Sequence, residues 1–374
     1  MKLKVILTLL FCGLCLFSTT GCGPASVNNQ YVFTLKGTWD SVRDFSEGLA
    51  AVKKDGKWGY INSDGILVVD LQYDGAWSFR EGLAAVKKDG KWGYIDKNGA
   101  VIIPFTFEQT YGFSEDRAVY AEGVYYGYID RQGNRITEAI YSEAADFRGG
   151  AACVKKKTRY GFIDLNGKEV TPISYGAKSE ISEGLAEVFE DYLSGYINAN
   201  GTLVIPMTLD DGKEFSEGYA AAQKDDLWGY IDKTGTFVIS PAWNDAESFQ
   251  EGRAVVTKAR LKGYIDKEGN ALTEIRFSHA YAYVNGMARV GLTENGQVRF
   301  GFLNTEGQEV LSCQYVNARD FNQEYAAVSS SKKWGFIAKD GTSITGEKWE
   351  SVGDFNEGLA WVKSGDSYKF IKLK

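Results

Sequence analysis

Short apolar segments, separated by polar turns that contain glycine, follow one another along nearly the whole chain. Segments such as residues 83–86 and 94–96 are too short, and lie too close to turn residues, to form helices. The polar segment between them, residues 87–91, contains an Asp-Gly pair, which favours the positive φ angles of a tight hairpin. The pattern therefore predicts short antiparallel β-strands joined by glycine turns.

The predicted hairpins recur with a period of 34 residues. Each contains the tripeptide Trp-Gly-Tyr or a variant of it, and the glycine stands at Gly59, Gly93, Gly127, Gly161, Gly195, Gly229, Gly263, Gly301 and Gly335, with Lys369 in the tenth place. The one longer step, of 38 residues before Gly301, is explained by four extra residues around positions 292–296, in a hairpin tip. A fixed period of this length is typical of stacked supersecondary units.

Two kinds of position are constant between the ten units. An alanine precedes the glycine position by nine residues, or by thirteen in the unit with the insertion: Ala50, Ala84, Ala118, Ala152, Ala186, Ala220, Ala254, Ala288, Ala326 and Ala360. An aromatic residue always follows the glycine position. A position that accepts only a small apolar side chain predicts close packing between neighbouring units, and the aromatic residues predict a core that crosses unit boundaries.

A third strand is predicted after the second turn of each unit, most clearly at residues 101–103 and 203–205. The fold class predicted is all-β, a tandem repeat of about ten three-stranded antiparallel units in an open β-solenoid-like superhelix. The alternative is a closed β-propeller, whose blades typically have four strands and number up to about eight. In the last unit Lys369 replaces the glycine and Lys372 replaces the turn Asx, which we interpret as the polar cap of an open stack.

Three sub-motifs recur together: Phe-Ser-Glu-Gly-Leu-Ala at residues 45–50, Lys-Trp-Gly-Tyr-Ile at residues 57–61, and Ile-Pro at residues 205–206. In this combination the chain resembles the bacterial WG-repeat (KWG-repeat) family from about Trp39 to Ile371. Some units depart from the motif, with Ser194 or Lys262 at the position of its tryptophan. The resemblance implies a β-repeat protein and leaves its biochemical role open.

The first residues predict export and lipid attachment. Lys2 and Lys4 precede a largely apolar run at residues 5–17, which is short for a bilayer span and is typical of a cleaved signal. The sequence Thr-Thr-Gly-Cys at residues 19–22 resembles a bacterial lipoprotein cleavage box. We therefore predict a signal peptide at residues 1–21, lipidation of Cys22, a tether at residues 22–30 and the repeat domain at residues 31–374, anchored to a membrane at the cell envelope or cell surface.

Composition narrows the classes of partner. The formal net charge is −7 and the isoelectric point is near 5.1, which argues against a nucleic-acid partner. Cys12 and Cys15 fall in the predicted signal peptide, so the repeat domain keeps Cys153 and Cys313, whose spacing gives no local pairing signal. Stability that depends on disulfides is not expected.

Catalytic, metal and cofactor sites are not predicted. The single histidine, His279, has no second histidine with which to form a ligand pair. Each Asp-x-x-Gly turn offers one carboxylate, whereas calcium needs six or more oxygen ligands. Seven glutamates recur before glycine or a turn residue, at Glu47, Glu81, Glu115, Glu183, Glu217, Glu251 and Glu357, and such regular spacing is typical of turn chemistry and not of one acid–base pair.

Two binding functions remain. The first is a membrane-anchored, exported, non-enzymatic repeat protein that presents an extended surface to a protein partner. The alternative is a cell-wall or glycan-binding module whose repeated aromatic residues, Trp58, Trp92, Trp228 and Trp334, face the ligand. Ser194 and Lys262 replace this tryptophan in two units, which a repeated sugar site would not easily allow, so the sequence favours the protein-binding hypothesis.

Overall fold

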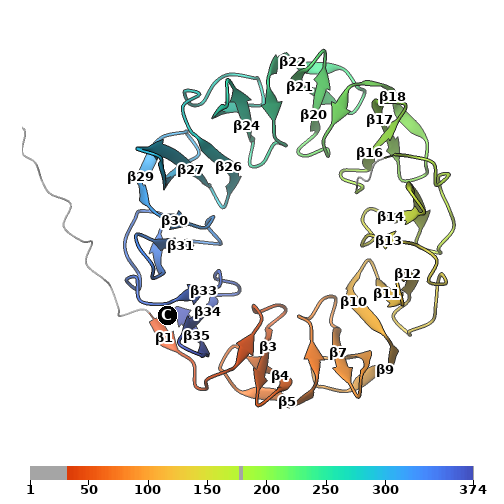
Figure 1. Cartoon of the computed structure of the whole chain (residues 1–374), viewed down its shortest axis with the longest axis vertical. Helices are drawn as coiled ribbons and strands as arrows, with labels where there is room; N and C mark the ends of the chain where they lie inside the picture. The colour runs from red at the N-terminus through yellow and green to blue at the C-terminus, as the bar shows by residue number, and fades with distance from the viewer. Residues whose placement is uncertain (1–31, 177–179, 374) are drawn as a thin grey trace, which may run out of the picture.

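The computed structural model describes residues 32–176 and 180–373, so the predicted signal peptide, tether and Cys22 lie outside the described residues. The described chain forms ten antiparallel sheets of three or four strands, and it contains no helix. The sheets follow one another around a ring, each with one strand near the centre and another near the outside (Figure 1). The predicted all-β tandem repeat of about ten antiparallel units is confirmed.

In the described chain, nine of the ten units have an innermost strand, of two residues in seven units and of six residues in units three and eight, and all ten units have a second strand of five to eight residues. The innermost strands are β2 (Ser41–Val42), β6 (Gly75–Ala76), β10 (Gln109–Ser114), β13 (Glu143–Ala144), β19 (Asp211–Gly212), β23 (Asp245–Ala246), β26 (His279–Val284), β30 (Asn317–Ala318) and β33 (Ser351–Val352). The second strands are β3 (Leu49–Lys54), β7 (Ala84–Lys88), β11 (Arg117–Glu122), β14 (Ala151–Lys156), β16 (Leu185–Glu190), β20 (Tyr219–Lys224), β24 (Arg253–Lys258), β27 (Met287–Glu294), β31 (Tyr325–Ser329) and β34 (Leu359–Ser364). The sequence analysis did not predict the innermost strand, because in seven units it has only two residues, which give no periodic signal, and only β10 and β26 are longer.

The third strand of each unit carries the Trp-Gly motif, and six units add an outermost strand. The third strands are β4 (Lys57–Asn62), β8 (Lys91–Ile95), β12 (Tyr125–Ile129), β15 (Arg159–Asp164), β17 (Leu193–Asn198), β21 (Leu227–Asp232), β25 (Leu261–Asp266), β28 (Gln297–Leu303), β32 (Gly335–Ala338) and β35 (Ser367–Leu373). The outermost strands are β5 (Leu67–Tyr73), β9 (Val101–Phe107), β18 (Leu203–Leu209), β22 (Phe237–Trp243), β29 (Glu309–Tyr315) and β1 (Val32–Thr34). Units are numbered one to ten from β2.

One side chain distinguishes units with an outermost strand from units without one. In units three, four, seven and nine, a threonine hydroxyl accepts the backbone N–H of the aromatic residue after the glycine, at 2.8–3.1 Å: Thr137, Thr171, Thr273 and Thr345. Units with a long outermost strand have an aliphatic residue at this position, such as Val69 or Ile103, and pair it with the aromatic residue through the backbone. The threonine therefore satisfies a buried donor where the regular strand is absent.

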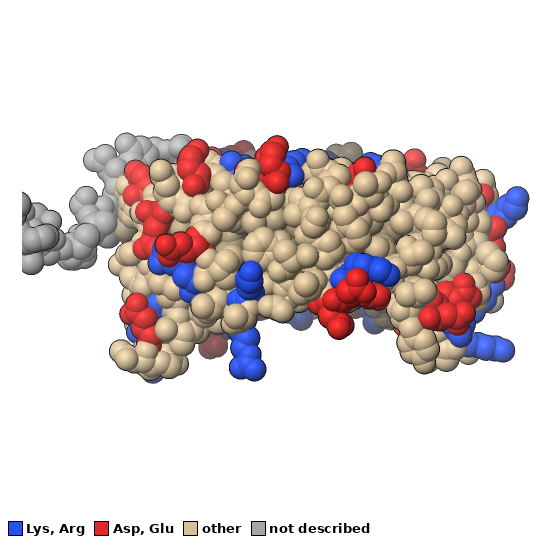
Figure 2. Space-filling model, turned by 90° about the horizontal axis from the view of Figure 1, so that it is seen from above, with Lys and Arg blue, Asp and Glu red and all other residues tan. Residues whose placement is uncertain are grey.

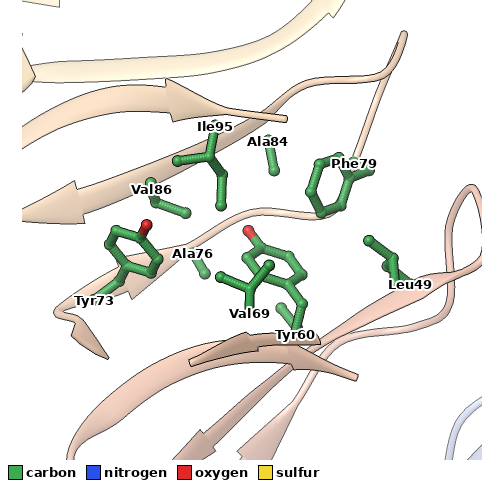
Figure 3. Close-up of a cluster of buried hydrophobic side chains, with 10 residues drawn as sticks. Leu49, Tyr60, Val69, Tyr73, Ala76, Phe79, Ala84, Val86 and Ile95 are labelled. Atoms are coloured by element: carbon green, nitrogen blue, oxygen red, sulfur yellow. The ribbon is translucent and has the colours of Figure 1, made fainter. Parts of the chain in front are cut away.

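The core lies between units and not within them. In one cluster, Tyr60 and Val69 from unit one pack against Phe79, Ala84 and Ile95 from unit two (Figure 3). All ten members of the alanine column are at most 2% exposed, as close packing predicted. A single unit has too little apolar area for its own core, so each is stabilised by its two neighbours.

The tyrosines that follow the motif glycine, and the repeated glutamates, also join neighbouring units. The Tyr60 hydroxyl donates to the Trp77 carbonyl oxygen at 2.7 Å, and Tyr94, Tyr128, Tyr196, Tyr230 and Tyr264 make the same contact 17 residues ahead. Glu47 has a positive φ of 55° and accepts the Gly82 N–H at 3.0 Å, in the corresponding turn of the next unit. The strained backbone of the glutamate is thus offset by a charge-assisted bond across the interface.

The ring is closed by contacts between unit ten and the start of the chain. Strand β1 pairs with β35 and supplies the outermost strand of unit ten. The closing interface repeats the contacts of the others: Glu357 accepts the Gly48 N–H at 2.8 Å, and Phe45 lies edge-on to Phe370 at 5.0 Å. Eight equivalent aromatic pairs between consecutive units have centroid distances of 4.6–5.1 Å.

These contacts bear on the choice between an open and a closed stack. As in a solenoid, every unit keeps its own sheet. Within residues 32–176 and 180–373, no sheet is shared between units or closes on itself, except that β1 comes from the other end of the chain. The path of the stack, however, is the ring of the alternative prediction, because its two ends meet. The interpretation of Lys372 as a polar cap was wrong, since its Nζ donates to the Ser63 carbonyl oxygen of unit one at 3.2 Å.

Candidate binding surface on the inner edge of the ring

One position on the inner edge changes its chemistry from unit to unit while its backbone is held in the same way. We call it the inner column: Arg43, Trp77, Tyr111, Ala145, Lys213, Glu247, Tyr281, Arg319 and Gly353, with Ser179 outside the described residues. These residues directly follow or belong to the innermost strands. In six units the carbonyl oxygen of the inner-column residue, or of its equivalent, accepts the buried tyrosine hydroxyl described above. A fixed backbone with variable side chains is a suitable basis for a binding surface.

The four Trp-Gly tryptophans lie beneath the inner column. Trp228 is 7% exposed, and Trp58, Trp92 and Trp334 are half-buried. Arg43, Lys213 and Arg319 place a cationic group 5.7, 5.1 and 5.4 Å from the ring centres of the tryptophan in their own unit. Trp92 is instead stacked with Trp77, at 6.3 Å between ring centres and 25° between planes. Each tryptophan is therefore engaged by an inner-column side chain, which gives it a packing role.

The glycine of the motif is required because the backbone of the outermost strand passes very close to it. Trp58 pairs with Tyr73 and Tyr60 pairs with Val69, so the outermost strand bulges over Gly59. A Cβ atom at Gly59 would lie 2.9 Å from the carbonyl group of Asp70, and still closer to the carbonyl oxygen of Val69. Since no backbone can approach a Cβ so closely, the Trp-Gly pair is explained by packing alone.

Two cavities open beside inner-column residues. The first, of about 530 Å³, is lined by residues of units two, three and four, among them Trp77, Tyr111 and Tyr126. The second, of about 500 Å³, is lined by residues of units eight to ten, among them Arg319 and Asp320. Neither cavity was predicted from the sequence, although the variability of its positions between units would have singled out the inner column.

Ion pairs join successive units along the inner edge. Arg289 contacts Asp320 at 2.8 Å and Arg319 contacts Asp354 at 3.4 Å, both beside the second cavity. The Arg289 guanidinium also lies 3.5 Å from the Tyr281 ring centre. Because these groups are partly exposed, they contribute little stability, and their main effect is to fix the charge pattern of the inner edge.

One carboxyl group on the second strand of unit five is strongly perturbed. Burial, together with a smaller effect of the nearby Asp211 carboxylate, raises the pKa of Glu187 to about 7. The Ser194 hydroxyl, which is fully buried, donates to Glu187 at 2.5 Å and opposes the shift. Glu187 takes a place that is alanine in units one, two, six and nine, and the only other charged residue at this place is Arg289 in unit eight.

This perturbation predicts a pH-dependent stability. In the unfolded chain the pKa of Glu187 is near its ordinary value. Between about pH 4.5 and 7 the unfolded chain therefore binds fewer protons than the folded chain, and the free energy of unfolding falls as the pH rises. Between pH 5 and pH 8, we expect the free energy of unfolding, measured with urea, to fall by about 2 kcal/mol less in Glu187→Gln than in the wild type. Glu190→Gln, at the exposed end of the same strand, is the control. Equal pH dependence in the wild type and Glu187→Gln would contradict the assignment.

Other polar candidates have structural partners. His279 is half-buried, with Nδ1 3.1 Å from the Ser278 hydroxyl and its ring 6.0 Å from Phe300. The Asp96 carboxylate accepts the N–H groups of Asn98 and Ala100 at 2.9 and 2.8 Å, so this Asp-x-x-Gly turn is an Asx turn. Over residues 32–176 and 180–373, no three His, Cys, Asp or Glu side chains are grouped as metal ligands would be.

The rest of the surface has no dominant charge on the side that Figure 2 shows, where acidic and basic side chains are interspersed. Cys153 is buried and Cys313 is half-buried, and neither forms a disulfide within the described residues. Burial raises the pKa of Cys313 to about 11, which keeps this thiol protonated and unreactive at neutral pH. In the described part of the chain, no helix could span a lipid bilayer.

The fold and its inner edge define a ring-shaped tandem β-repeat protein with variable side chains on a constant scaffold. Comparison with protein families gives its class. Ten segments match the WG containing repeat, at residues 33–58, 58–92, 92–123, 126–157, 160–193, 195–228, 228–259, 263–292, 300–334 and 334–368. The chain therefore belongs to the WG-repeat family, as the sequence motifs indicated. No functionally curated protein matches it.

Solved structures of other proteins show only distant likeness. Hsv2p of Kluyveromyces lactis is 10% identical and has a TM-score of 0.34, over 61% of this chain and 92% of that chain. The WD40 domain of SCAP from fission yeast is 6% identical with a TM-score of 0.34, over 91% and 98%. PorZ, a bacterial surface component of the type-IX secretion system of Porphyromonas gingivalis, is 10% identical with a TM-score of 0.28, over 91% and 58%. Scores this low support no argument about this chain.

Proposed function

We propose that this protein is an exported, non-enzymatic binding protein of a bacterial cell envelope, held on a membrane by a lipid on Cys22, and that the inner edge of its ring binds a protein partner. The observation that carries the partner proposal is the inner column. Its members include cationic, anionic, aromatic and small side chains, whereas the alanine and aromatic columns hardly vary. The positions that pack the units together hardly change between units. Sequence variation is therefore concentrated at positions that could contact a partner.

The second candidate, a glycan module built on the four Trp-Gly tryptophans, has less support. Stacking on a sugar requires an open aromatic face, and these side chains are buried or half-buried beneath Arg43, Lys213, Arg319 and Trp77. The repeated glutamates are likewise engaged, since their carboxylates accept N–H groups from the next unit, which supports a role in packing and not in catalysis.

Lipid attachment is tested by labelling. Cys22→Ala should abolish incorporation of a fatty-acid label in a bacterial host and release the protein from membranes, because two or three acyl chains are needed for stable anchoring. Cys313→Ala is the matched control and should keep both properties, since Cys313 is a half-buried thiol of the repeat domain. A Cys22→Ala protein that still carries the label would place the acylated residue elsewhere.

Partner binding is tested by site-specific photocrosslinking in intact cells. A photoreactive residue at Arg319, on the inner edge, should give one defined protein adduct. The same residue at Lys91, at an exposed hairpin tip, should give none. Equal adducts at both sites, or none at either while the protein stays bound to cell-wall glycan, would contradict the proposal and favour the glycan alternative.

A further inference from the structure

The cavity beside Trp77 and Tyr111 is lined by side chains from three successive units, two, three and four. Its wall combines Trp77 and Arg80 from unit two, Tyr111 and Tyr126 from unit three, and Asp146 from unit four. Its volume of about 530 Å³ lies within the range of roughly 300–1,000 Å³ typical of small-molecule sites. Three successive units thus contribute to one site, although each is built on the same template.

Gly112 makes this cavity possible. The equivalent position carries Asp or Glu in six other units, for example Asp44 and Asp146. A Cβ atom at Gly112 would lie 2.6 Å from Cδ of Arg80. Because Gly112 has no side chain, the Arg80 side chain of unit two can pass over it. Arg80 thereby contacts Asp146 of unit four at 2.9 Å, 66 residues away. Unit three also has a six-residue innermost strand, β10, where unit two has only two residues.

The aromatic side chains of the cavity are not equivalent. Trp77 is engaged by the Arg43 guanidinium, 4.1 Å from its ring centre, and by the stacked Trp92. Tyr111 lies 6.5 Å from Tyr126 in a tilted arrangement, and among the described residues no arginine or lysine lies over its ring. Tyr111 is half-buried and lines the cavity, so it offers the aromatic surface that the Trp-Gly tryptophans lack.

The charged groups of the cavity are balanced. Arg80 is paired with Asp146, and Glu143 is paired with Lys155 at 2.6 Å and accepts the Tyr160 hydroxyl. The site therefore has no unpaired charge to attract an ion of either sign. A guanidinium has five N–H donors and a carboxylate about four acceptor sites, so the single contact between Arg80 and Asp146 leaves both groups able to bond a ligand beside an aromatic surface.

We propose that this cavity binds a neutral saccharide, with the apolar face of one pyranose ring on Tyr111 and its hydroxyl groups bonded to Arg80 and Asp146. A pyranose presents C–H groups on one face and hydroxyl groups around its edge, which matches an aromatic wall beside balanced polar groups. This site uses residues other than the four Trp-Gly tryptophans. It takes up only the part of the inner column at Trp77 and Tyr111, away from the Arg319 position at which partner binding is tested, so the two proposals can fail separately.

The proposal is tested on the folded full repeat domain with four neutral disaccharides: cellobiose, maltose, lactose and N,N′-diacetylchitobiose. Isothermal titration and saturation-transfer NMR should detect binding of at least one of them. Tyr111→Ala should weaken that binding by about tenfold or more, and Tyr111→Phe should retain it, because stacking needs the ring and not the hydroxyl. Tyr281→Ala, at the same column in unit eight, should leave the affinity unchanged.

A second variant tests the shape of the cavity without removing an aromatic ring. Gly112→Asp introduces the residue that unit four carries, so it should displace Arg80 and abolish binding while the circular dichroism spectrum stays that of the wild type. Failure of all four disaccharides to bind would overturn the proposal. Binding that Tyr111→Ala leaves intact, or that Tyr281→Ala weakens equally, would place the sugar elsewhere and overturn it as well.

Discussion

A chain that begins at Asp40 is expected to unfold at a clearly lower temperature than a chain that begins at Gln30. The shorter chain lacks β1, so β35 loses its backbone partner and the closing core loses Leu35 and Trp39. Removal of a large core aromatic side chain alone costs about 3–5 kcal/mol, and the lost strand pairing adds to this. From about 2.1 cal/mol/K per residue, a domain of this length loses about 1.4 °C per kcal/mol, so the melting temperature measured by circular dichroism should fall by roughly 5–10 °C.

A matched pair of substitutions separates ring closure from a general effect of truncation. Trp39 and Trp243 occupy the same column, both are half-buried, and both pack beside an interface between units. If the ring is closed in solution, Trp39→Ala should cost about as much as Trp243→Ala, on the order of 3 kcal/mol. A costly Trp243→Ala beside a neutral Trp39→Ala would show that unit ten and unit one are not in contact.

The residues that close the ring were visible in the sequence, but their relation was not. The column of Trp39 has ten members and ends at Trp349, so unit ten has no such residue of its own. In the structure Trp39 takes this position for unit ten. Its backbone pairs with that of Tyr368, as the backbone of Tyr73 pairs with that of Trp58 in unit one. Counting strands by column would therefore have predicted closure. The choice of an open stack rested on typical propeller sizes, which say nothing about how neighbouring units are angled.

Strand pattern and packing positions were predictable, because they repeat ten times and each repetition confirms the others. The inner edge was not, because its chemistry is that of single residues: Gly112 matters only since Arg80 of the preceding unit needs the space above it. Periodicity shows which positions the fold constrains, whereas a binding cavity is formed at positions the fold leaves free. The tryptophans drew attention for the opposite reason, since they repeat as packing residues do.

Ring closure also changes how solution scattering should be interpreted. A compact protein of this length would have a radius of gyration near 21 Å, from about 2.2 Å multiplied by the residue number to the power 0.38. A ring exceeds this value because its mass lies away from the centre, so a large radius alone does not indicate an open stack. The discriminating comparison is between the wild type and the chain that begins at Asp40, whose radius should increase if the ring opens.

Deletion of one complete unit is expected to have a still larger effect. Removing residues 196–229 joins Gly195 to Tyr230 and restores the Trp-Gly type of strand in register, so that each local interface remains correct. Nine units with the same inter-unit angle do not complete the ring that ten units complete. The alanine column is fully buried at every interface, which leaves little room for the angle to change.

The nine-unit protein must therefore either lose the closing interface or strain all the others. In both cases its melting temperature should fall at least as far as that of the chain beginning at Asp40. Trp39→Ala in the nine-unit background distinguishes the two outcomes. If the ring has opened, Trp39 has no partner and the substitution adds little, which is the non-additivity expected for two changes that disrupt one interface. A nine-unit protein with wild-type stability, in which Trp39→Ala still costs about 3 kcal/mol, would show that the interfaces bend enough to close a smaller ring.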